Sequence, residues 1–140
     1  IEKNGLKDFA REESMGVICF SPLAQGMLSE KYLKGIPSDS RIAKDGRFLH
    51  ADDITPEKME GIRRLDEIAK RRGQTLPQMA LAWDLRDPEI TSVLIGASKP
   101  QQILENLGAI ENISFSEEEL REIDEIQASI AGELDARRHV

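Results

Sequence analysis

Two short segments, the apolar Val17 to Phe20 and Thr91 to Ile95, which ends in three apolar residues, have the composition of buried strands and constrain the fold more than any other feature of the sequence. A continuous apolar run is typical of a strand that is covered on both faces, as the strands of parallel sheets are. The segments around them have helical periodicity instead. Helices that alternate with such strands predict an α/β fold, in which the two strands lie side by side in parallel and helices cover their outer side.

Local signals predict where helices begin and end. Gly16 is expected to end a helix over residues 5–14 in the left-handed conformation that glycine adopts readily. Thr55 is expected to cap a second helix with Pro56 at its first position, and Gly73 to end it. The buried stripe of this second helix is expected to consist of Met59, Ile62, Leu65, Ile68 and Ala69.

Three more helices are expected further along the chain. One begins at Thr75 or Leu76 and ends before Asp87-Pro88. The next follows Gly96-Ala97-Ser98 directly and has its apolar residues on one side, namely Ile103, Leu107 and Ile110. The last is an acidic helix in which Ser116 and Glu119 have the spacing of a capping box, with one apolar face made of Leu120, Ile123, Ile126 and Ile130.

Two strands leave both edges of a sheet unpaired, and a two-stranded parallel sheet with about five helices is not a stable layer architecture by itself. The sequence also opens at Ile1 within a polar stretch, without an initiator methionine. We therefore expect the chain to be the downstream part of a larger fold. Residues 35–54 have no sustained period and are expected to form a long loop, which is usually functional beyond about 12 to 15 residues.

Composition limits the class of protein and its partners. With 140 residues, 39% of them hydrophobic, the chain is expected to form one domain over residues 1–140. The net charge of −7 argues against nucleic acid or an anionic membrane as a partner. No apolar run approaches the length of a membrane span or marks a signal peptide. The single cysteine, Cys19, permits no internal disulfide, so a cytoplasmic location is expected.

Small and polar residues follow both predicted strands. Gly96 allows a ligand to approach the backbone closely, and Ser98 is expected to cap a helix whose N-terminus faces the same place. Lys99 adds positive charge, while Gln102 and Asn106 lie one helical turn apart. The segment Ser21-Pro22-Leu23-Ala24-Gln25-Gly26 has the same position after the first strand. Because ligands collect at the carboxyl ends of parallel strands, a phosphate-bearing ligand is expected between the two loops.

Four motifs lie in this part of the chain: Phe20-Ser21-Pro22-Leu23-Ala24-Gln25-Gly26, then Lys31-Tyr32, then Gly35-Ile36-Pro37 with Ser40-Arg41, and finally Ser92-Val93-Leu94-Ile95-Gly96-Ala97-Ser98 with Gln102, Glu105 and Asn106. Together they resemble the carboxyl-terminal part of the aldo-keto reductase family, over residues 5 to 127. Within that family the similarity is greatest to bacterial glyceraldehyde-3-phosphate reductases and to the β subunits of voltage-gated potassium channels.

The resemblance implies an α/β fold of the (β/α)8 TIM-barrel type that uses NADPH, with the two strands as strands 7 and 8 and helices around them. It assigns the nicotinamide contact to Phe20, the pyrophosphate to Ser21, Pro22, Leu23 and Gly26, and a loop that closes over the cofactor to Lys31 and Arg41. The adenosine end is assigned to Gly96, Ser98, Gln102, Glu105 and Asn106, and the positive charge of Lys99 places this residue with them as a candidate cofactor contact. Among these, Ser98 and Gln102 are implied near the 2′-phosphate, and Glu105 and Asn106 near the adenine. Many members have an arginine near the position of Lys99, so the preference for NADPH over NADH is less firmly implied.

The resemblance assigns no catalytic residue to this chain, because the catalytic Asp, Tyr, Lys and His of the family correspond to sequence upstream of Ile1. We interpret Tyr32 as a packing residue, His50 and His139 as surface residues, and Cys19 and Trp83 as core residues, as their sequence surroundings suggest. The sequence has no cluster of Cys and His that would indicate a metal site.

The parent protein is therefore expected to be an NADPH-dependent oxidoreductase that reduces aldehydes or ketones, small carbonyl compounds, to alcohols. The 140-residue chain alone is expected to be inactive and to self-associate as a homo-oligomer through its unpaired strand edges. Two alternatives remain open. One is an NADPH-binding regulatory or interaction module like the potassium-channel β subunits, and the other is an inactive truncated product.

Overall fold

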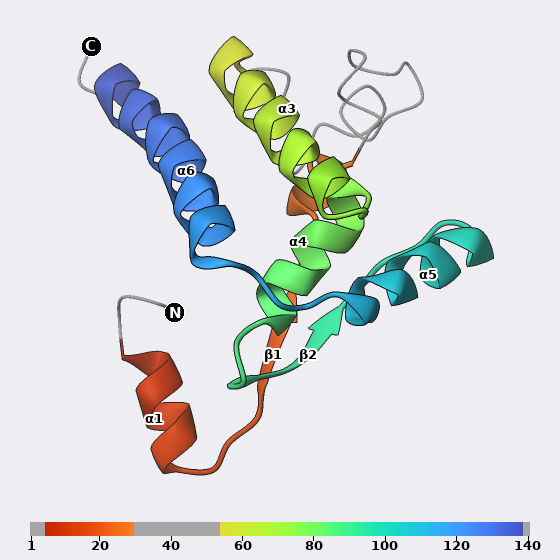
Figure 1. The fold of residues 1–140 in the computed structure, drawn as a ribbon. Coiled ribbons are helices and arrows are strands. Elements are labelled where there is room, and N and C mark those ends of the chain that lie inside the picture. The colour runs from red at the N-terminus through yellow and green to blue at the C-terminus, as the bar shows by residue number, and fades with distance from the viewer. Residues whose placement is uncertain (1–4, 30–53, 139–140) are drawn as a thin grey trace.

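The computed structural model describes residues 5–29 and 54–138, which Figure 1 draws in colour. Helices and two strands alternate along these residues, which confirms the α/β class. The elements, with η for a 3-10 helix, are α1 (Leu6–Glu12), β1 (Val17–Phe20), η1 (Ala24–Gly26), α3 (Pro56–Arg71), α4 (Leu76–Leu85), β2 (Ile90–Leu94), α5 (Pro100–Leu107), η3 (Gly108–Glu111) and α6 (Glu117–Arg138).

The strands β1 and β2 pair in parallel, as predicted. They are the two strands found in the described part of the chain, and they lie next to each other in Figure 1. β2 begins and ends one residue earlier than predicted, because Val17 pairs with Ile90 across a register shift and the ladder stops at Phe20. The pairs that follow the shift are Ile18 with Ser92, Cys19 with Val93 and Phe20 with Leu94.

The prediction that both faces of β1 and β2 are buried is wrong, because one face of the two strands is exposed. Ile18 is 59% exposed, Phe20 79% and Leu94 58%, whereas Val17 and Cys19 are half-buried. The alternation arises because successive side chains of a strand point to opposite faces and α4 packs against β2. We call the side of the sheet that bears Ile18, Phe20 and Leu94 its open face.

The helix α1 ends in a different way from the one predicted. Ser14, with a φ of 54°, takes the left-handed conformation expected of Gly16. The absence of a side chain at Gly16 matters for another reason, because a Cβ there would lie 2.8 Å from Oγ1 of Thr91 on β2. This glycine therefore allows the chain entering β1 to approach β2 closely.

The beginnings of α3 and α4 agree with their capping signals. Thr55 accepts a hydrogen bond from the backbone N–H of Lys58 at 3.2 Å, and Pro56 occupies the first position of α3. Thr75 and Gln78 form a reciprocal capping box at the start of α4. The helix end predicted at Gly73 is confirmed, and this glycine adopts a left-handed φ of 69° just after α3.

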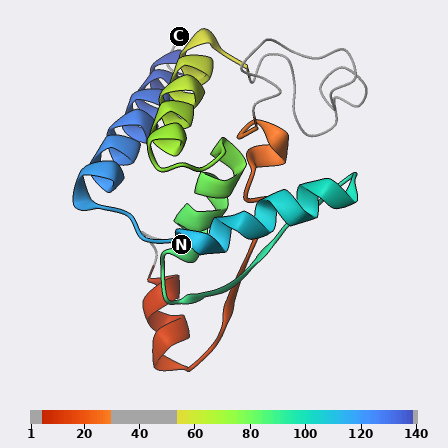
Figure 2. The same cartoon turned by 45° about the vertical axis from the view of Figure 1, so that its right-hand side comes forward.

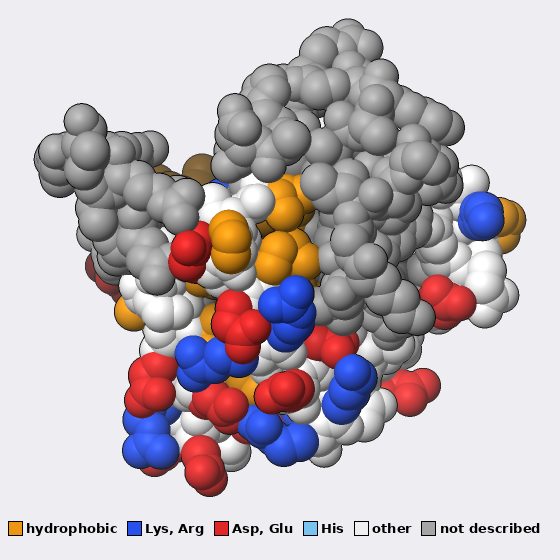
Figure 3. All heavy atoms as spheres, turned by 90° about the horizontal axis from the view of Figure 1, so that it is seen from above, with side chains coloured by type: hydrophobic (Ala, Val, Ile, Leu, Met, Phe, Trp, Pro, Cys, Tyr) orange, Lys and Arg blue, Asp and Glu red, His pale blue; other side chains and the backbone are white. Residues whose placement is uncertain are grey.

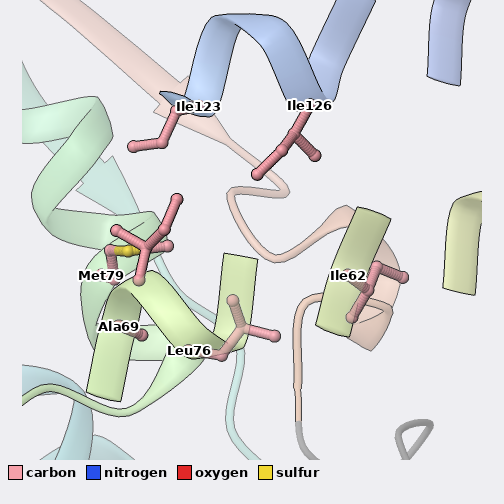
Figure 4. Close-up of a cluster of buried hydrophobic side chains, with 7 residues drawn as sticks. Ile62, Ala69, Leu76, Met79, Ile123 and Ile126 are labelled. Carbon is pink, nitrogen blue, oxygen red and sulfur yellow. The ribbon is translucent and has the colours of Figure 1, made fainter. Parts of the chain in front are cut away.

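A hydrophobic core cluster lies between α3, α4 and α6, and it contains the fully buried Ile68, Leu76 and Ile126. Figure 2 shows α3 and α6 packed side by side, and Figure 4 shows Ile123 and Ile126 of α6 lying across from side chains of α3 and α4. The stripe predicted for α3 is confirmed: Ile62, Ile68 and Ala69 are buried, and Met59 and Leu65 pack against the cluster as partly buried residues.

The last two long helices differ in how well they are covered. Ser116 and Glu119 form the predicted capping box of α6, and Ile123 and Ile126 are buried. In contrast, the apolar side of α5 is exposed, with Ile103 at 46% and Leu107 at 52%, so its predicted face lacks cover from the described residues. Figure 3, a view of one face, shows acidic and basic side chains mixed over its coloured part, with hydrophobic side chains visible among them. Among residues 5–29 and 54–138, no helix has the length and apolar character needed to cross a bilayer.

Candidate functional site

The loops that follow β1 and β2 leave the sheet at the same end. Parallel pairing requires this, because Phe20 and Leu94 are the last residues of the two strands and lie opposite each other. The predicted site residues Ser21 to Gly26 and Gly96 to Lys99 therefore come from neighbouring strand ends. This is the place where open and closed α/β folds bind ligands.

The loop after β1 has an unusual concentration of left-handed backbone. Ser21, Ala24, Gln25 and Gly26 have φ values of 56°, 46°, 59° and 97°. Three of these residues have side chains, and such a conformation costs each of them about 1 kcal/mol or more. Backbone hydrogen bonds hold the turn, from Gly26 N–H to the Leu23 carbonyl at 2.8 Å and from Ala24 N–H to the Ser21 carbonyl at 3.1 Å. The loop is thus a compact, locally strained turn of the kind that often forms part of a binding site.

The loop after β2 is organised by the side chain of Gln102. Its Oε1 atom accepts hydrogen bonds from the backbone N–H of Ser98 at 2.8 Å, from the Ser98 hydroxyl at 3.1 Å and from the backbone N–H of Lys99 at 3.1 Å. The expectation that Ser98 caps the helix is wrong, since Lys99 is the N-cap and Pro100 the first residue of α5. The capping atom comes from inside the helix because a glutamine at the third helical position can reach back to the cap.

Positive charge and open space lie at this loop. Lys99 has no carboxylate partner among the described residues, and a Cβ added at Gly96 would meet no atom within 4 Å. Three hydrogen-bond donors converge on one oxygen, Gln102 Oε1, so an anion that displaced this oxygen would find the same donors with Lys99 beside them. The loop can therefore hold an anionic group such as a phosphate.

The two remaining residues predicted at the adenosine end are on α5. Gln102 and Asn106 are both half-buried and share one side of the helix, as their spacing predicts, while Glu105 is exposed. The backbone carbonyl of Glu105 accepts a hydrogen bond from Gln78 Nε2 at 2.8 Å, which fastens α5 to α4. This contact of Gln78 with α5 was not predicted from the sequence. The sequence shows only that Gln78 has the capping-box spacing from Thr75.

Other predicted site residues differ in exposure or lie outside the described residues. Phe20 is on the open face at the end of β1, and Pro22 and Leu23 are half-buried in the following turn. Lys31 and Arg41 lie outside the described residues, so their predicted place in a closing loop stays a prediction. The same holds for Tyr32, His50 and His139.

Neither a metal centre nor a reactive thiol is indicated by the described residues. In residues 5–29 and 54–138, no three His, Cys, Asp or Glu side chains gather closely enough to hold a metal ion. Burial, together with the carboxylates of Asp84 and Asp87, raises the pKa of the Cys19 thiol. A raised pKa disfavours the thiolate, which is the nucleophilic form. Cys19 is half-buried, so the interpretation of a core residue is correct only in part.

Comparison with known proteins gives a consistent family. The profile of the Aldo/keto reductase family matches residues 1–128. The chain is 46% identical over 128 residues to L-glyceraldehyde 3-phosphate reductase of Escherichia coli, from strains O157:H7 and K12, which covers 89% of this chain and 37% of the relative. It is 39% identical over 127 residues to a Schizosaccharomyces pombe protein named for the β subunit of a voltage-gated potassium channel, covering 88% of this chain and 37% of the relative.

A solved structure has a similar fold. A thermostable aldo-keto reductase, crystallised with the inhibitor epalrestat, matches with a TM-score of 0.58 and 28% sequence identity. The match covers 89% of this chain and 34% of that one. The chain thus spans 37% of the length of these curated relatives, and its fold corresponds to part of a larger α/β barrel.

Proposed function

This chain belongs to the aldo/keto reductase family, and we propose on that basis that it forms part of an NADPH-dependent oxidoreductase that reduces aldehydes or ketones to alcohols. In this proposal β1 and β2 are the seventh and eighth strands of the (β/α)8 barrel, and the protein works in the cytoplasm. The observation that carries the proposal is the position of two family motifs at the carboxyl ends of two paired parallel strands.

The described residues fit the anionic end of NADPH. Two backbone N–H groups and the Ser98 hydroxyl converge at Gln102 Oε1, and Lys99 carries a positive charge in the same loop; we propose that this loop takes the 2′-phosphate. Glu105 and Asn106 follow on α5 and are proposed to contact the adenine. The pyrophosphate is proposed to lie along the strained turn that contains Ser21, Pro22, Leu23 and Gly26.

The role of this segment is binding and orientation. When bound, NADPH supplies the hydride for the reduction. Phe20, exposed at the end of β1, is proposed to stack against the nicotinamide, and Lys31 and Arg41 to belong to a loop that covers the cofactor. No residue of this chain is proposed as the proton donor to the carbonyl. The chain alone is accordingly proposed to be inactive.

The cofactor assignment is tested by charge reversal in the longer protein that carries this segment. Lys99→Glu should weaken NADPH binding about tenfold or more and leave NADH binding within about twofold, because NADH lacks the 2′-phosphate. The difference should shrink at high salt. Arg121→Glu, an exposed charge reversal on α6, is the matched control and should change neither affinity. Equal losses for the two cofactors after Lys99→Glu would refute the assignment.

The reaction is tested by following NADPH oxidation with a series of aldehydes and ketones. L-Glyceraldehyde 3-phosphate is the first substrate to assay, because a reductase named for it is 46% identical to this chain. Saturable NADPH oxidation with any member of the series supports the proposal. Tight NADPH binding without turnover of any carbonyl compound contradicts it.

A second candidate function is a regulatory NADPH-binding subunit, which is favoured by the 39% identity to the protein named for a potassium-channel β subunit. Here the bound cofactor would adjust the affinity for a partner protein. The discriminating measurement is cofactor binding without turnover together with a partner affinity that differs between NADPH and NADP⁺.

A further inference from the structure

The side chain of Gln78 on α4 connects two helices. Its Oε1 atom accepts a hydrogen bond from the backbone N–H of Thr75 at 2.9 Å, within the capping box that begins α4. Its Nε2 atom donates to the backbone carbonyl of Glu105, in the last turn of α5, at 2.8 Å. One carboxamide therefore uses its acceptor at the start of α4 and its donor at the end of α5.

Gly108, which follows α5 directly, makes room for this carboxamide. A Cβ added to Gly108 would lie 2.6 Å from Gln78 Nε2, closer than real Cβ contacts. The backbone of Gly108, with φ −60° and ψ −14°, has a conformation that any residue adopts. The need for glycine at this position therefore comes from the space that the Gln78 side chain occupies.

The described residues hold α5 mainly at its two ends. Its apolar side buries little area against them, since Ile103 is 46% exposed, Leu104 63% and Leu107 52%. The start of the helix is attached to the loop after β2 through the hydrogen bonds of Gln102, and its end is attached to α4 through Gln78. These two attachments therefore set the direction of α5 relative to the sheet and to α4.

We propose that Gln78 is a positioning residue for the adenosine end of the cofactor site. This inference rests on the proposed function, in which Gln102, Glu105 and Asn106 of α5 contact the adenosine. Binding groups contribute fully only when supporting residues hold them within about 0.5 Å of the productive geometry. When the bond from Gln78 to Glu105 is lost, α5 turns about its remaining attachment at Gln102, and the proposed contacts shift together.

Two substitutions break this bond in different ways in the longer protein that carries the segment. Gln78→Glu keeps an acceptor for the Thr75 N–H and replaces the donor to the Glu105 carbonyl by a carboxylate oxygen. Gly108→Ala adds no charge, suits the helical backbone and displaces the carboxamide. Each should weaken NADPH binding about five- to tenfold, and the double variant should lose little more because both changes remove the same bond. Gln127→Glu adds the same charge at an exposed position of α6 and should leave the affinity unchanged.

Adenosine 2′,5′-bisphosphate is the adenosine end of NADPH without the nicotinamide half, and it separates positioning from a general loss of structure. Each variant should lose affinity for this probe by the same factor as for NADPH, because the defect lies at the adenosine end. Hydrogen exchange without ligand provides a second measurement. The backbone amides of Ser98 and Lys99 should exchange faster in both variants, because α5 is less firmly held against the loop after β2.

Thermal unfolding shows that each variant is folded before it is scored. If the unaltered protein does not bind NADPH, the proposed function fails and this inference fails with it. If the unaltered protein binds NADPH, an unchanged affinity in folded Gln78→Glu or Gly108→Ala overturns this inference alone. A loss of affinity for NADPH without a loss for the bisphosphate, or unchanged exchange at Ser98 and Lys99, also overturns it.

Discussion

Arg72, just after α3, and Glu119, in the first turn of α6, form an ion pair with Nη1 and Oε2 2.7 Å apart, and the arginine side chain is only 3% exposed. Its remaining N–H groups donate to the backbone carbonyls of Asn112 and Ser114 and to Gln74 Oε1. The guanidinium also lies 3.6 Å from the centroid of the Phe115 ring. One side chain thus joins the end of α3 to the chain that leads into α6.

Replacing Arg72 by Met should therefore lower the free energy of unfolding by about 3 kcal/mol, because a buried ion pair loses one partner, the Ser114 carbonyl loses its donor and the Asn112 carbonyl keeps only Gln74 Nε2. Urea unfolding measures the effect. Arg71→Met is the matched control: Arg71 pairs with Glu122 at an exposed site, where such pairs contribute less than about 1 kcal/mol. Similar losses in both variants would show that the interactions of Arg72 do not stabilise the fold.

Gln102→Ala should loosen the start of α5. The change removes the oxygen that accepts three hydrogen bonds from Ser98 and Lys99, and the loss of a cap costs about 1 kcal/mol. We expect faster hydrogen exchange at the amides of Ser98 and Lys99. The neighbouring Gln101→Ala, an exposed glutamine with no such bonds among the described contacts, should leave these rates unchanged.

Asp87 should make stability depend on pH in the acid range. Burial alone would raise the pKa of its carboxyl, but hydrogen bonds from Glu89 and Lys7 outweigh it and lower the pKa to about 2 from 3.8. The folded state binds a proton less readily than the unfolded state, so this stabilisation is complete above about pH 4 and is lost as the pH falls toward 2.

The variant Asp87→Asn removes this dependence. Between about pH 5 and pH 2, its urea unfolding midpoint should fall less steeply than that of the unmodified chain. Asp124→Asn changes an exposed carboxylate on α6 and is the control. A slope that is unaffected by Asp87→Asn would disprove the coupling.

Gly16→Ala should destabilise the contact between β1 and β2. The new Cβ would lie 2.8 Å from Thr91 Oγ1, closer than real Cβ contacts, so Thr91 or the chain entering β1 must shift, and at this exposed site we expect a cost of about 1 kcal/mol. Adding Thr91→Ala should restore most of the loss, which a double-mutant cycle measures. Gly96→Ala is the control, because the added methyl group would meet no atom within 4 Å.

The chain by itself should bind NADPH weakly and self-associate. Its two loops supply only part of the proposed cofactor contacts, and the open face leaves Ile18, Phe20 and Leu94 in water. Fluorescence titration should show no micromolar binding, and light scattering should show species larger than a monomer. The double variant Ile18→Thr/Leu94→Thr should shift the distribution toward monomer. Micromolar NADPH binding by a monodisperse monomer would contradict this prediction.

Helix starts were predictable from sequence where the signal is local. Three helices begin at a side chain that accepts a hydrogen bond from the backbone N–H three residues later, namely Thr55, Thr75 and Ser116. A few neighbouring side chains therefore decide where each of these helices begins. At α5 the same reasoning selected Ser98 because serine is a common cap. It overlooked that a glutamine at the third helical position can reach back to the cap.

Burial was harder to predict, because periodicity shows which residues share a face and does not show what covers it. Ile103 and Leu107 lie on one side of α5 as predicted, yet both are exposed. Gly16 was predicted to adopt the left-handed conformation after α1 because glycine adopts it most readily. In the structure Ser14 adopts that conformation, and Gly16 instead allows the close approach to Thr91. For the candidate site, parallel pairing made the meeting of the two loops predictable, but the arrangement of donors around Gln102 depends on rotamers that the sequence does not specify.

The pairing of β1 with β2 also affects how the chain emerges from the ribosome. Phe20 and Ile90 are about seventy residues apart, so at about 5 to 20 residues per second β1 waits several seconds for its partner to be synthesised. The buried cluster of α3, α4 and α6 is completed only when Ile126 has been made, later still. During that interval the edge of Val17 to Phe20 that pairs with β2 is open, which makes this apolar strand a natural binding sequence for a chaperone that holds nascent chains.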